Sequence, residues 1–225
     1  MASLVATLFD FNGVLVDDEA VHLAGFRAVL APMGITITDE AYAERYLGFD
    51  DVGAFRAMLA DAGRAPTDAE IAALVRAKVP EYMARIGGAL VVFEGAADIV
   101  RRRARLGTVG IVSGALRHEI EHALGVLGVR DEVAFIVSAE DTRACKPDPE
   151  GYLLGKRALA EQGHDEAKGV VVIEDSIAGV EAAKAAGLRC AAVEHSYPAA
   201  RLRAAGADVV VPRLADLGDA ALDGA

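Results

Sequence analysis

The chain has 225 residues, with 34 acidic and 23 basic side chains and a formal net charge of -11. A field of this sign repels the phosphates of nucleic acids, so we expect no nucleic-acid partner. Hydrophobic residues make up 53% of the chain, yet no apolar run approaches the roughly 18 residues that a membrane helix needs, and we expect no membrane association.

The amino-terminal segment carries no basic stretch and runs directly into a predicted strand, Leu4–Phe9. This pattern differs from that of a signal peptide, so we predict a cytoplasmic location. The two cysteines, Cys145 and Cys190, are too few for a disulfide framework and lack metal-site spacing. Reduced structural cysteines are expected.

The predicted strand Leu4–Phe9 is followed by a long segment with helical patterns and no convincing strand. Pro32-Met33-Gly34 breaks its first helix, and Thr38-Asp39 and Thr67-Asp68 have the composition of helix starts. A helical insert of this length between two strands is typical of a small additional domain. We predict an all-helical cap domain over residues 18–88.

From about Glu94 onward, short runs rich in valine and isoleucine alternate with alanine-rich amphipathic segments. The predicted strands are Gly107–Val112, Val133–Val137, Val170–Glu174, Arg189–Val193 and Asp208–Val211. The predicted helices include Ala96–Leu106, Leu116–Leu127, Pro149–Gln162 and Ile177–Ala186. This alternation predicts the α/β class, with a Rossmann-like, doubly wound parallel sheet as the core, formed by residues 1–17 and 89–225. The basic run Arg101–Arg105 falls late in a predicted helix and is interpreted as a solvated helix end.

Chemically active side chains follow several of the predicted strands. Asp10 ends the first strand, Ser113-Gly114 ends the second, and Glu174-Asp175 ends the fourth, while Lys146 lies in a loop between a strand and a helix. In an open parallel sheet such residues gather at the carboxyl edge. Three carboxylates at one place require a cation, and hard oxygen ligands favour Mg²⁺. Lysine, hydroxyl and backbone donors then suit a phosphoryl group.

In this arrangement the chain resembles the haloacid dehalogenase superfamily, in the branch of phosphatases and β-phosphoglucomutase-like enzymes whose helical cap follows the first strand. Four ordered motifs carry the resemblance: Asp10-Phe11-Asn12-Gly13-Val14-Leu15-Val16-Asp17, Ser113-Gly114, Lys146-Pro147-Asp148-Pro149, and Glu174-Asp175-Ser176-Ile177-Ala178-Gly179. Each motif is weak alone, but the four occur in the family's order, and the resemblance extends over nearly the whole chain. Taken singly, these residues would be capping, turn or surface residues.

The resemblance implies a role for each of these residues. Asp10 would be the nucleophile that forms an aspartyl phosphate. Mg²⁺ would be held by Asp10, the backbone carbonyl of Asn12 and Asp175, with Glu174 binding directly or through water. Ser113, the backbone amide of Gly114 and Lys146 would hold the phosphoryl oxygens, and His22 is a further candidate for substrate binding. The implied enzyme is a phosphatase acting on a small phosphorylated metabolite, and we expect a monomer.

Asn12 departs from the family pattern, which has an acid-base aspartate at this position. An amide transfers no proton in this way, and loss of such help typically costs about 10²- to 10⁴-fold. Asn12 is open to three interpretations: an engineered substitution, a natural one with another acid-base group, or a chain that only binds phosphate esters. Asp18 is the first candidate for the other group and His22 the second, although Asp18 also suits a helix N-cap.

Other members of the superfamily fit less well. Dehalogenases need no metal, whereas this chain keeps the acidic pair Glu174-Asp175. Phosphonoacetaldehyde hydrolase needs a lysine in its cap, but Lys78 lies well past the predicted cap loop, residues 46–51. In β-phosphoglucomutase that loop carries two cations for a second phosphate; the matching residues here are Leu47 and Asp51. We therefore favour hydrolysis over a phosphomutase reaction, which stays the alternative. The other histidines are predicted to be surface or structural residues: His118, His122, His164 and His195.

Overall fold

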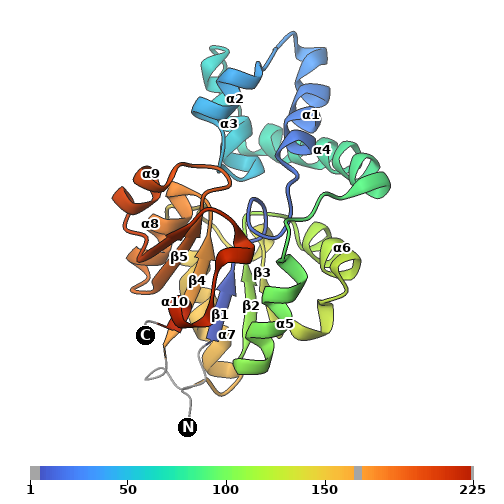
Figure 1. Ribbon diagram of the computed structural model, residues 1–225. Helices are drawn as coiled ribbons and strands as arrows, with labels where there is room; N and C mark the ends of the chain where they lie inside the picture. The colour runs from blue at the N-terminus through green and yellow to red at the C-terminus, as the bar shows by residue number, and fades with distance from the viewer. Residues whose placement is uncertain (1–5, 165–168, 224–225) are drawn as a thin grey trace. The chain divides into compact units, whose positions relative to one another are not determined.

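The core of the protein is one six-stranded parallel sheet in the order β3-β2-β1-β4-β5-β6 (Figure 1). The computed structural model describes residues 6–164 and 169–223. The strands are β1 (Ala6–Phe9), β2 (Val109–Val112), β3 (Phe135–Val137), β4 (Val170–Glu174), β5 (Arg189–Val193) and β6 (Val209–Val211). From β1 the chain first builds the sheet on one side, through β2 and β3, and then crosses to β4 on the other side of β1. Ligands bind at such a change of direction in sheets of this kind.

Strand β1 is buried along its whole length, as its uninterrupted run of apolar or small residues predicts. Thr7 pairs with Val109 on one side and with Val171 on the other. Burial on both faces and pairing on both edges fix the register of this strand. Asp10 therefore leaves the sheet at its centre, directly after the last residue of β1.

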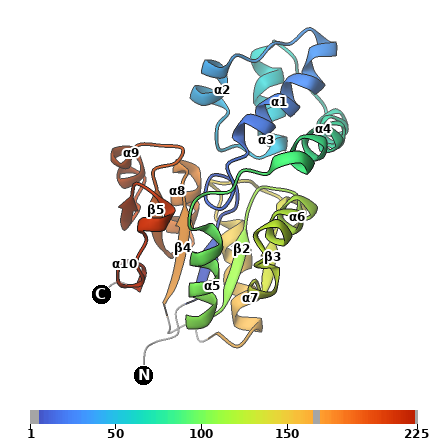
Figure 2. The ribbon, with the colours of Figure 1, turned by 45° about the vertical axis from the view of Figure 1, so that its right-hand side comes forward.

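Helices cover both faces of the sheet (Figure 2). The helices of the core are α5 (Ala96–Leu106), α6 (Arg117–Leu127), α7 (Glu150–Glu161), α8 (Ile177–Ala185), α9 (Ala199–Ala204) and α10 (Asp219–Asp223). On one face Leu8 and Val112 pack with Tyr152 of α7 and Val180 of α8. On the other face Arg103 of α5 contacts Thr7, because neighbouring residues of a strand point to opposite sides.

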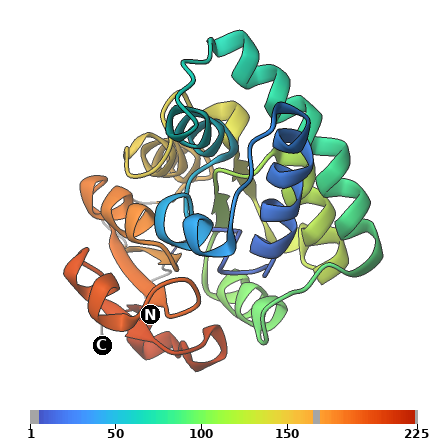
Figure 3. The ribbon, with the colours of Figure 1, turned by 90° about the horizontal axis from the view of Figure 1, so that it is seen from above.

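The insertion between β1 and β2 is entirely helical in regular structure. It contains α1 (Glu19–Leu30), a 3₁₀ turn (Ala31–Met33), α2 (Asp39–Arg45), α3 (Asp51–Asp61) and α4 (Asp68–Ala89). Thr38, Asp50 and Thr67 cap the last three helices through their side chains, which satisfies backbone donors at the helix starts. Its own apolar cluster includes Phe26, Phe55 and Met58, and α1 and α4 lie side by side (Figure 3).

The chain divides into two compact units, Met1–Asp17 with Val92–Ala225, and Asp18–Val91. The predicted fold, an α/β parallel sheet with a helical insertion after the first strand, is confirmed. Within residues 6–164 and 169–223, no helix is both long and apolar enough to cross a membrane.

Three predicted strands begin later than their composition indicates: β6 starts one residue after the predicted Asp208, and β2 and β3 start two residues late for a common reason. Gly107 ends α5, and its N–H donates to the carbonyl of Arg103, so β2 starts only at Val109. Val133 follows a 3₁₀ turn (Arg130–Glu132), and its N–H donates to Arg130. In both places the preceding helix uses the backbone donor that a strand would need. Two residues of the predicted first strand, Leu4 and Val5, lie outside the described residues.

The basic run of α5 is not the solvated helix end that its composition indicates. Arg103 is completely buried; its Nε donates to Thr7 Oγ1 at 2.9 Å, and Nη1 contacts Asp219 at 3.1 Å. Arg102 also contacts Asp219, and Arg101 donates to the carbonyl of Gly128. These arginines tie α5 to β1, α10 and the end of α6, which explains the cluster without a nucleic-acid surface.

Candidate active site

Asp10 lies at the centre of the candidate site and is 7% exposed. Its backbone N–H donates to the carbonyl of Ile173, which extends the pairing of β1 with β4 by one residue. Lys146 donates to Asp10 Oδ1 at 2.7 Å. The carboxylate therefore stands at the carboxyl edge of the sheet with an ammonium group beside it.

Glu174 is completely buried and accepts hydrogen bonds at both carboxylate oxygens. Lys146 donates to Oε1 at 2.6 Å and the Tyr152 hydroxyl donates to the same atom at 2.7 Å. The Oε2 atom accepts from the backbone of Asp175 and from Ser176. With this many donors, Glu174 serves as a fixed anion that holds Lys146 beside Asp10.

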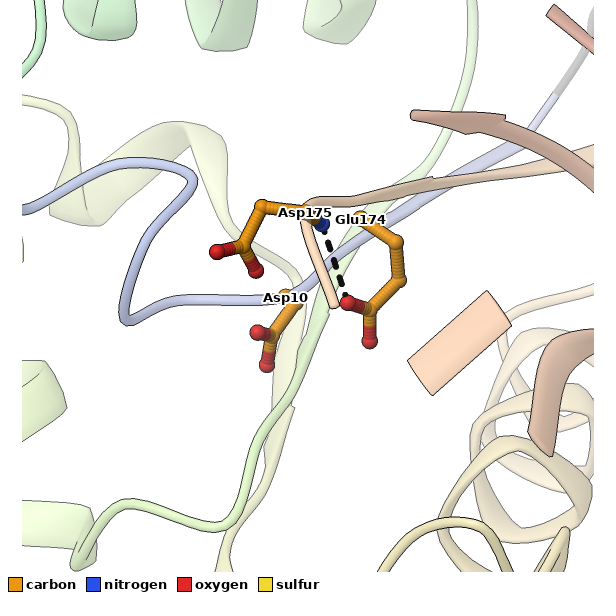
Figure 4. A group of neighbouring side chains, drawn as sticks. All are labelled: Asp10, Glu174 and Asp175. Carbon is orange, nitrogen blue, oxygen red and sulfur yellow. Dashed lines mark hydrogen bonds between the residues drawn. The ribbon is translucent and has the colours of Figure 1, made fainter. Parts of the chain in front are cut away.

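Asp175 completes an acidic group with Asp10 and Glu174 (Figure 4). One ligand atom of each residue can be chosen such that all three lie within 4.8 Å of one another, and all three residues are buried. Lys146 contributes one positive charge against three negative ones, so a further cation would lower the repulsion. Oxygen donors of this kind suit Mg²⁺. The residues present therefore fit a magnesium ion.

The pKa values of this group follow from its burial and from Lys146. Burial raises the pKa of Asp10 to about 6. Lys146 acts to lower this pKa, but the negative charge of Glu174 acts to raise it and offsets part of the effect of Lys146. Burial also works to raise the pKa of Glu174, but Lys146 and the other donors outweigh it and lower that pKa. The two carboxylates in turn raise the pKa of Lys146 against the effect of burial. Lys146 is therefore a permanent cation at neutral pH.

The loop after Asp10 brings Asn12 and Gly13 next to the acidic group. Gly13 has a φ of 73°, and a Cβ atom at this position would overlap the carboxylate of Asp175. Glycine is therefore required both by the backbone conformation and by the close packing. Ser113 donates to Asn12 Oδ1 at 3.4 Å and accepts from the N–H of Ala115 at 3.2 Å.

The structure thus brings together the residues from four separate sequence motifs: Asp10, Asn12, Ser113, Lys146, Glu174 and Asp175. Gly114 follows Ser113 directly and is exposed. Three residues near this group carry no such signal in the sequence. Tyr152 bonds Glu174, Ser196 donates to Asp175, and His195 contacts Gly13. Each is a single residue far along the chain from its partner, so spacing alone could not identify it.

Asp18 and His22 belong to the helical unit, where they form part of a buried polar cluster. The side chain of Asp18 makes no N-cap hydrogen bond; Asp18 Oδ2 instead accepts from the Tyr82 hydroxyl at 2.5 Å and lies 3.2 Å from His22 Nε2. Lys78 Nζ lies 2.6 Å from His22 Nδ1 and forms an ion pair with Asp51. Lys78 is thus in contact with the last residue of the predicted cap loop, although it is distant in sequence.

Opposing charges hold the cluster together. Burial and Lys78 both act to lower the pKa of His22, but Asp18 and Asp51 outweigh them and raise it to about 10. Lys78 Nζ and His22 Nδ1, 2.6 Å apart, therefore lie close to two carboxylates, those of Asp18 and Asp51. The side chain of Lys78 is 1% exposed, and its ammonium also lies 4.4 Å from the centre of the Phe26 ring.

We expect Lys78→Met to destabilise the helical unit by about 1–3 kcal/mol, since the partly buried Asp51 loses its ion pair with Lys78 and keeps only the more distant His22 as a positive partner. The double variant Lys78→Met/Asp51→Asn removes both charges and should lose less. Urea unfolding followed by circular dichroism would measure both free energies of unfolding. A double variant less stable than Lys78→Met would show that the ion pair is not the source of the loss.

Comparison with known proteins identifies the family. A family model described as haloacid dehalogenase-like hydrolase matches residues 7–193. Validoxylamine A 7'-phosphate phosphatase of Streptomyces hygroscopicus subsp. limoneus is 28% identical over 93% of this chain and 94% of its own length. N-acetylmuramic acid 6-phosphate phosphatase of Pseudomonas putida is 28% identical over 92% of each chain.

Solved structures of CbbY from Rhodobacter sphaeroides have the same fold. The complex with phosphate superposes with a TM-score of 0.83 at 26% identity and covers 98% of this chain and 99% of CbbY. An aspartate-to-asparagine mutant of CbbY in complex with xylulose-(1,5)bisphosphate has a TM-score of 0.80 at 28% identity, with the same coverage. The family and the enzyme class expected from the four motifs are confirmed: the chain belongs to the haloacid dehalogenase-like hydrolase family, in its phosphatase branch.

Proposed function

We propose that this chain is a magnesium-dependent phosphatase that hydrolyses a small phosphorylated sugar through an aspartyl phosphate on Asp10. The observation that carries the proposal is the contact of Lys146 with both Asp10 and Glu174, next to Asp175. A buried carboxylate nucleophile, a fixed cation and a possible metal site are the parts that phosphoryl transfer needs.

In the first step, a carboxylate oxygen of Asp10 forms a bond to phosphorus, and the bond from phosphorus to the leaving oxygen breaks. Lys146 stays protonated and stabilises negative charge on the phosphoryl oxygens, together with the hydroxyl of Ser113 and the backbone N–H of Gly114. In the second step, water attacks the same phosphorus atom, which releases inorganic phosphate and frees Asp10. The leaving oxygen gains one proton, and the attacking water loses one.

Mg²⁺ would be held by Asp10, Asp175 and the backbone carbonyl of Asn12, and when bound it would neutralise charge on the phosphoryl group. We assign Glu174 an indirect contact through water, because its two oxygens already accept hydrogen bonds from Lys146, Tyr152 and Ser176. Its direct function is then to position Lys146.

The two proton transfers require an acid-base group, and at the position where the family pattern has an aspartate for this purpose the chain has Asn12. The Asn12 amide can orient a water molecule but cannot act as a general acid or base at neutral pH. Asp18 remains our first candidate for the missing group and His22 the second. The contacts of Asp18 with His22 and Tyr82 support an ordered, hydrogen-bonded carboxylate.

The relatives support a sugar phosphate as the substrate class. Two of them are phosphatases of a 7'-phosphate and a 6-phosphate on carbohydrate-like molecules, and CbbY has been crystallised with a sugar bisphosphate. In the helical unit of this chain, Asp51 forms an ion pair with Lys78. That pairing neutralises a lysine which could otherwise attract a second phosphate, so we favour a monophosphate and hydrolysis over a phosphomutase reaction.

A second candidate function is a phosphate-ester binding module, and Asn12 is the observation that favours it. Binding needs Lys146, Ser113 and the metal site, whereas turnover also needs an acid-base group. This module would bind a sugar phosphate without measurable release of phosphate. A monomeric, cytoplasmic protein stays a prediction for either function.

Phosphate release from a panel of sugar phosphates tests the proposal. We expect Mg²⁺-dependent turnover, which EDTA abolishes and added Mg²⁺ restores. Below about pH 6 the Mg²⁺ concentration for half-maximal activity should rise, because protons and Mg²⁺ compete for Asp10, whose pKa is raised to about 6. No Mg²⁺-dependent release on any substrate, by this chain or by its Asn12→Asp variant, would overturn the proposal.

A further inference from the structure

The loop that follows β5 contacts two parts of the candidate site through consecutive residues. His195 Nδ1 lies 2.7 Å from the carbonyl oxygen of Gly13, three residues after Asp10. The next residue, Ser196, donates its hydroxyl hydrogen to Asp175 Oδ2. Gly13 and Asp175 in turn are packed against each other so closely that no side chain fits between them.

The contact with Gly13 fixes the state of the His195 ring. A carbonyl oxygen only accepts hydrogen bonds, so Nδ1 must carry the proton. Burial lowers the pKa of His195, although the Gly13 carbonyl and Asp17 act in the opposite direction. The ring is also stacked on Phe93, with centroids 3.8 Å apart and planes inclined by 15°. His195 is thus a neutral, oriented donor.

The loop itself is anchored at a second place. The backbone N–H of Glu194 donates to Val211 of β6, and Glu194 Oε1 accepts from the N–H of Ala199 at 2.6 Å. The donors of His195 and Ser196 are therefore presented from a segment that is attached to the edge of the sheet and to α9. Such a segment can restrain the loop after β1 instead of moving with it.

We propose that His195 and Ser196 are positioning residues that set the geometry of the metal site. His195 holds the Gly13 carbonyl, which fixes the peptide next to the Asn12 carbonyl, and Ser196 orients the carboxylate of Asp175. Hydrogen-bond partners of metal ligands typically change metal affinity by about 10- to 100-fold. The inference rests on the proposed function in one respect, namely that Asp10, Asn12 and Asp175 bind a divalent cation.

Two substitutions separate the hydrogen bond of His195 from its stacking. His195→Asn keeps an N–H donor near the position of Nδ1 but loses the ring. His195→Phe keeps a ring against Phe93 but has no donor. Binding of Mn²⁺, which accepts the same oxygen ligands as Mg²⁺, can be measured without substrate from the electron paramagnetic resonance signal of the free ion. We expect near-normal Mn²⁺ affinity for His195→Asn and an affinity about 10- to 100-fold weaker for His195→Phe.

Ser196 gives a second, independent comparison. Ser196→Thr keeps the hydroxyl and should bind Mn²⁺ nearly normally, whereas Ser196→Ala should bind it more weakly. His118 lies exposed on α6, so His118→Asn is the matched control and should bind Mn²⁺ as the unmodified chain does. In phosphatase assays, saturating Mg²⁺ should restore most of kcat in His195→Phe, which loss of the fold would not allow.

The outcomes distinguish this inference from the proposed function. Equal Mn²⁺ affinity in His195→Phe, Ser196→Ala and the unmodified chain would overturn the positioning roles and leave the phosphatase proposal intact. If His195→Asn binds Mn²⁺ weakly and His195→Phe binds it normally, the effect comes from stacking on Phe93. That result would also overturn the positioning role of the His195 hydrogen bond. If the unmodified chain binds no Mn²⁺, both proposals fail. Normal Mn²⁺ binding without turnover on any substrate contradicts the phosphatase alone.

Discussion

Asp10→Asn should abolish phosphatase activity, with a fall of at least about 10⁴-fold in kcat. Removing a nucleophile that forms a covalent intermediate typically has an effect of this size, because the other catalytic groups stabilise a transition state that cannot form without it. Fold and substrate binding should survive, since asparagine keeps the size of the side chain and Lys146 still has Glu174 as a partner. Initial rates of phosphate release at saturating Mg²⁺ measure the loss.

Covalent trapping gives a sharper measurement of the same role. Because Asn12 cannot activate the hydrolytic water, phosphorylated Asp10 should accumulate, and intact-protein mass spectrometry after exposure to substrate should detect one added phosphoryl group. Asp10→Asn should show none. Asp98→Asn, which changes an exposed aspartate in the first turn of α5, is the control and should be labelled normally. Equal labelling of Asp10→Asn would place the nucleophile elsewhere.

Much of the fold follows from local sequence patterns. The bounds predicted for β4, β5 and α5 coincide with the observed ones, Val170–Glu174, Arg189–Val193 and Ala96–Leu106. These elements have a strong apolar pattern and clear ends, so burial and local preference agree. The starts of β2 and β3 were less predictable, since they depend on how the preceding helical turn uses its backbone donors.

The candidate site, like the fold, could be predicted from the sequence only in part. Asp10 and Glu174 could be selected because each directly follows or ends a buried strand, and Lys146 because it lies in a family motif. The topology then brings these side chains together at one edge of the sheet. The resemblance supplied the roles, which geometry alone does not assign.

Contacts between single residues distant in the chain could not be predicted. Lys78 and His22 are 56 residues apart, and His195 and Gly13 are 182 residues apart. Neither pair belongs to a periodic pattern or a spaced motif. The burial of Lys78 is also contrary to what its residue type favours, and only the tertiary arrangement of α1, α3 and α4 supplies the partners that compensate for it.

Asn12→Asp should raise kcat by about 10²- to 10⁴-fold, the range typical of general acid-base catalysis. Asn12 lies two residues after the nucleophile, and its side chain contacts Ser113, so the new carboxyl group would stand next to a group that we assign to the phosphoryl oxygens. The nearby carboxylates should raise the pKa of the introduced aspartate and favour its protonated form, which is the form that donates a proton to the leaving oxygen. Steady-state kinetics on the best sugar phosphate would measure the gain.

Combining Asn12→Asp with Asp18→Ser tests whether Asp18 now supplies the missing proton transfer. If it does, Asp18→Ser should lower kcat strongly in the unmodified chain and only slightly in the Asn12→Asp variant, because Asp18 and the introduced carboxylate then perform the same task. A similar loss in both backgrounds would instead assign Asp18 to the structure of the helical unit, through its bonds to His22 and Tyr82. If Asn12→Asp leaves kcat unchanged, proton transfer at position 12 does not limit the reaction.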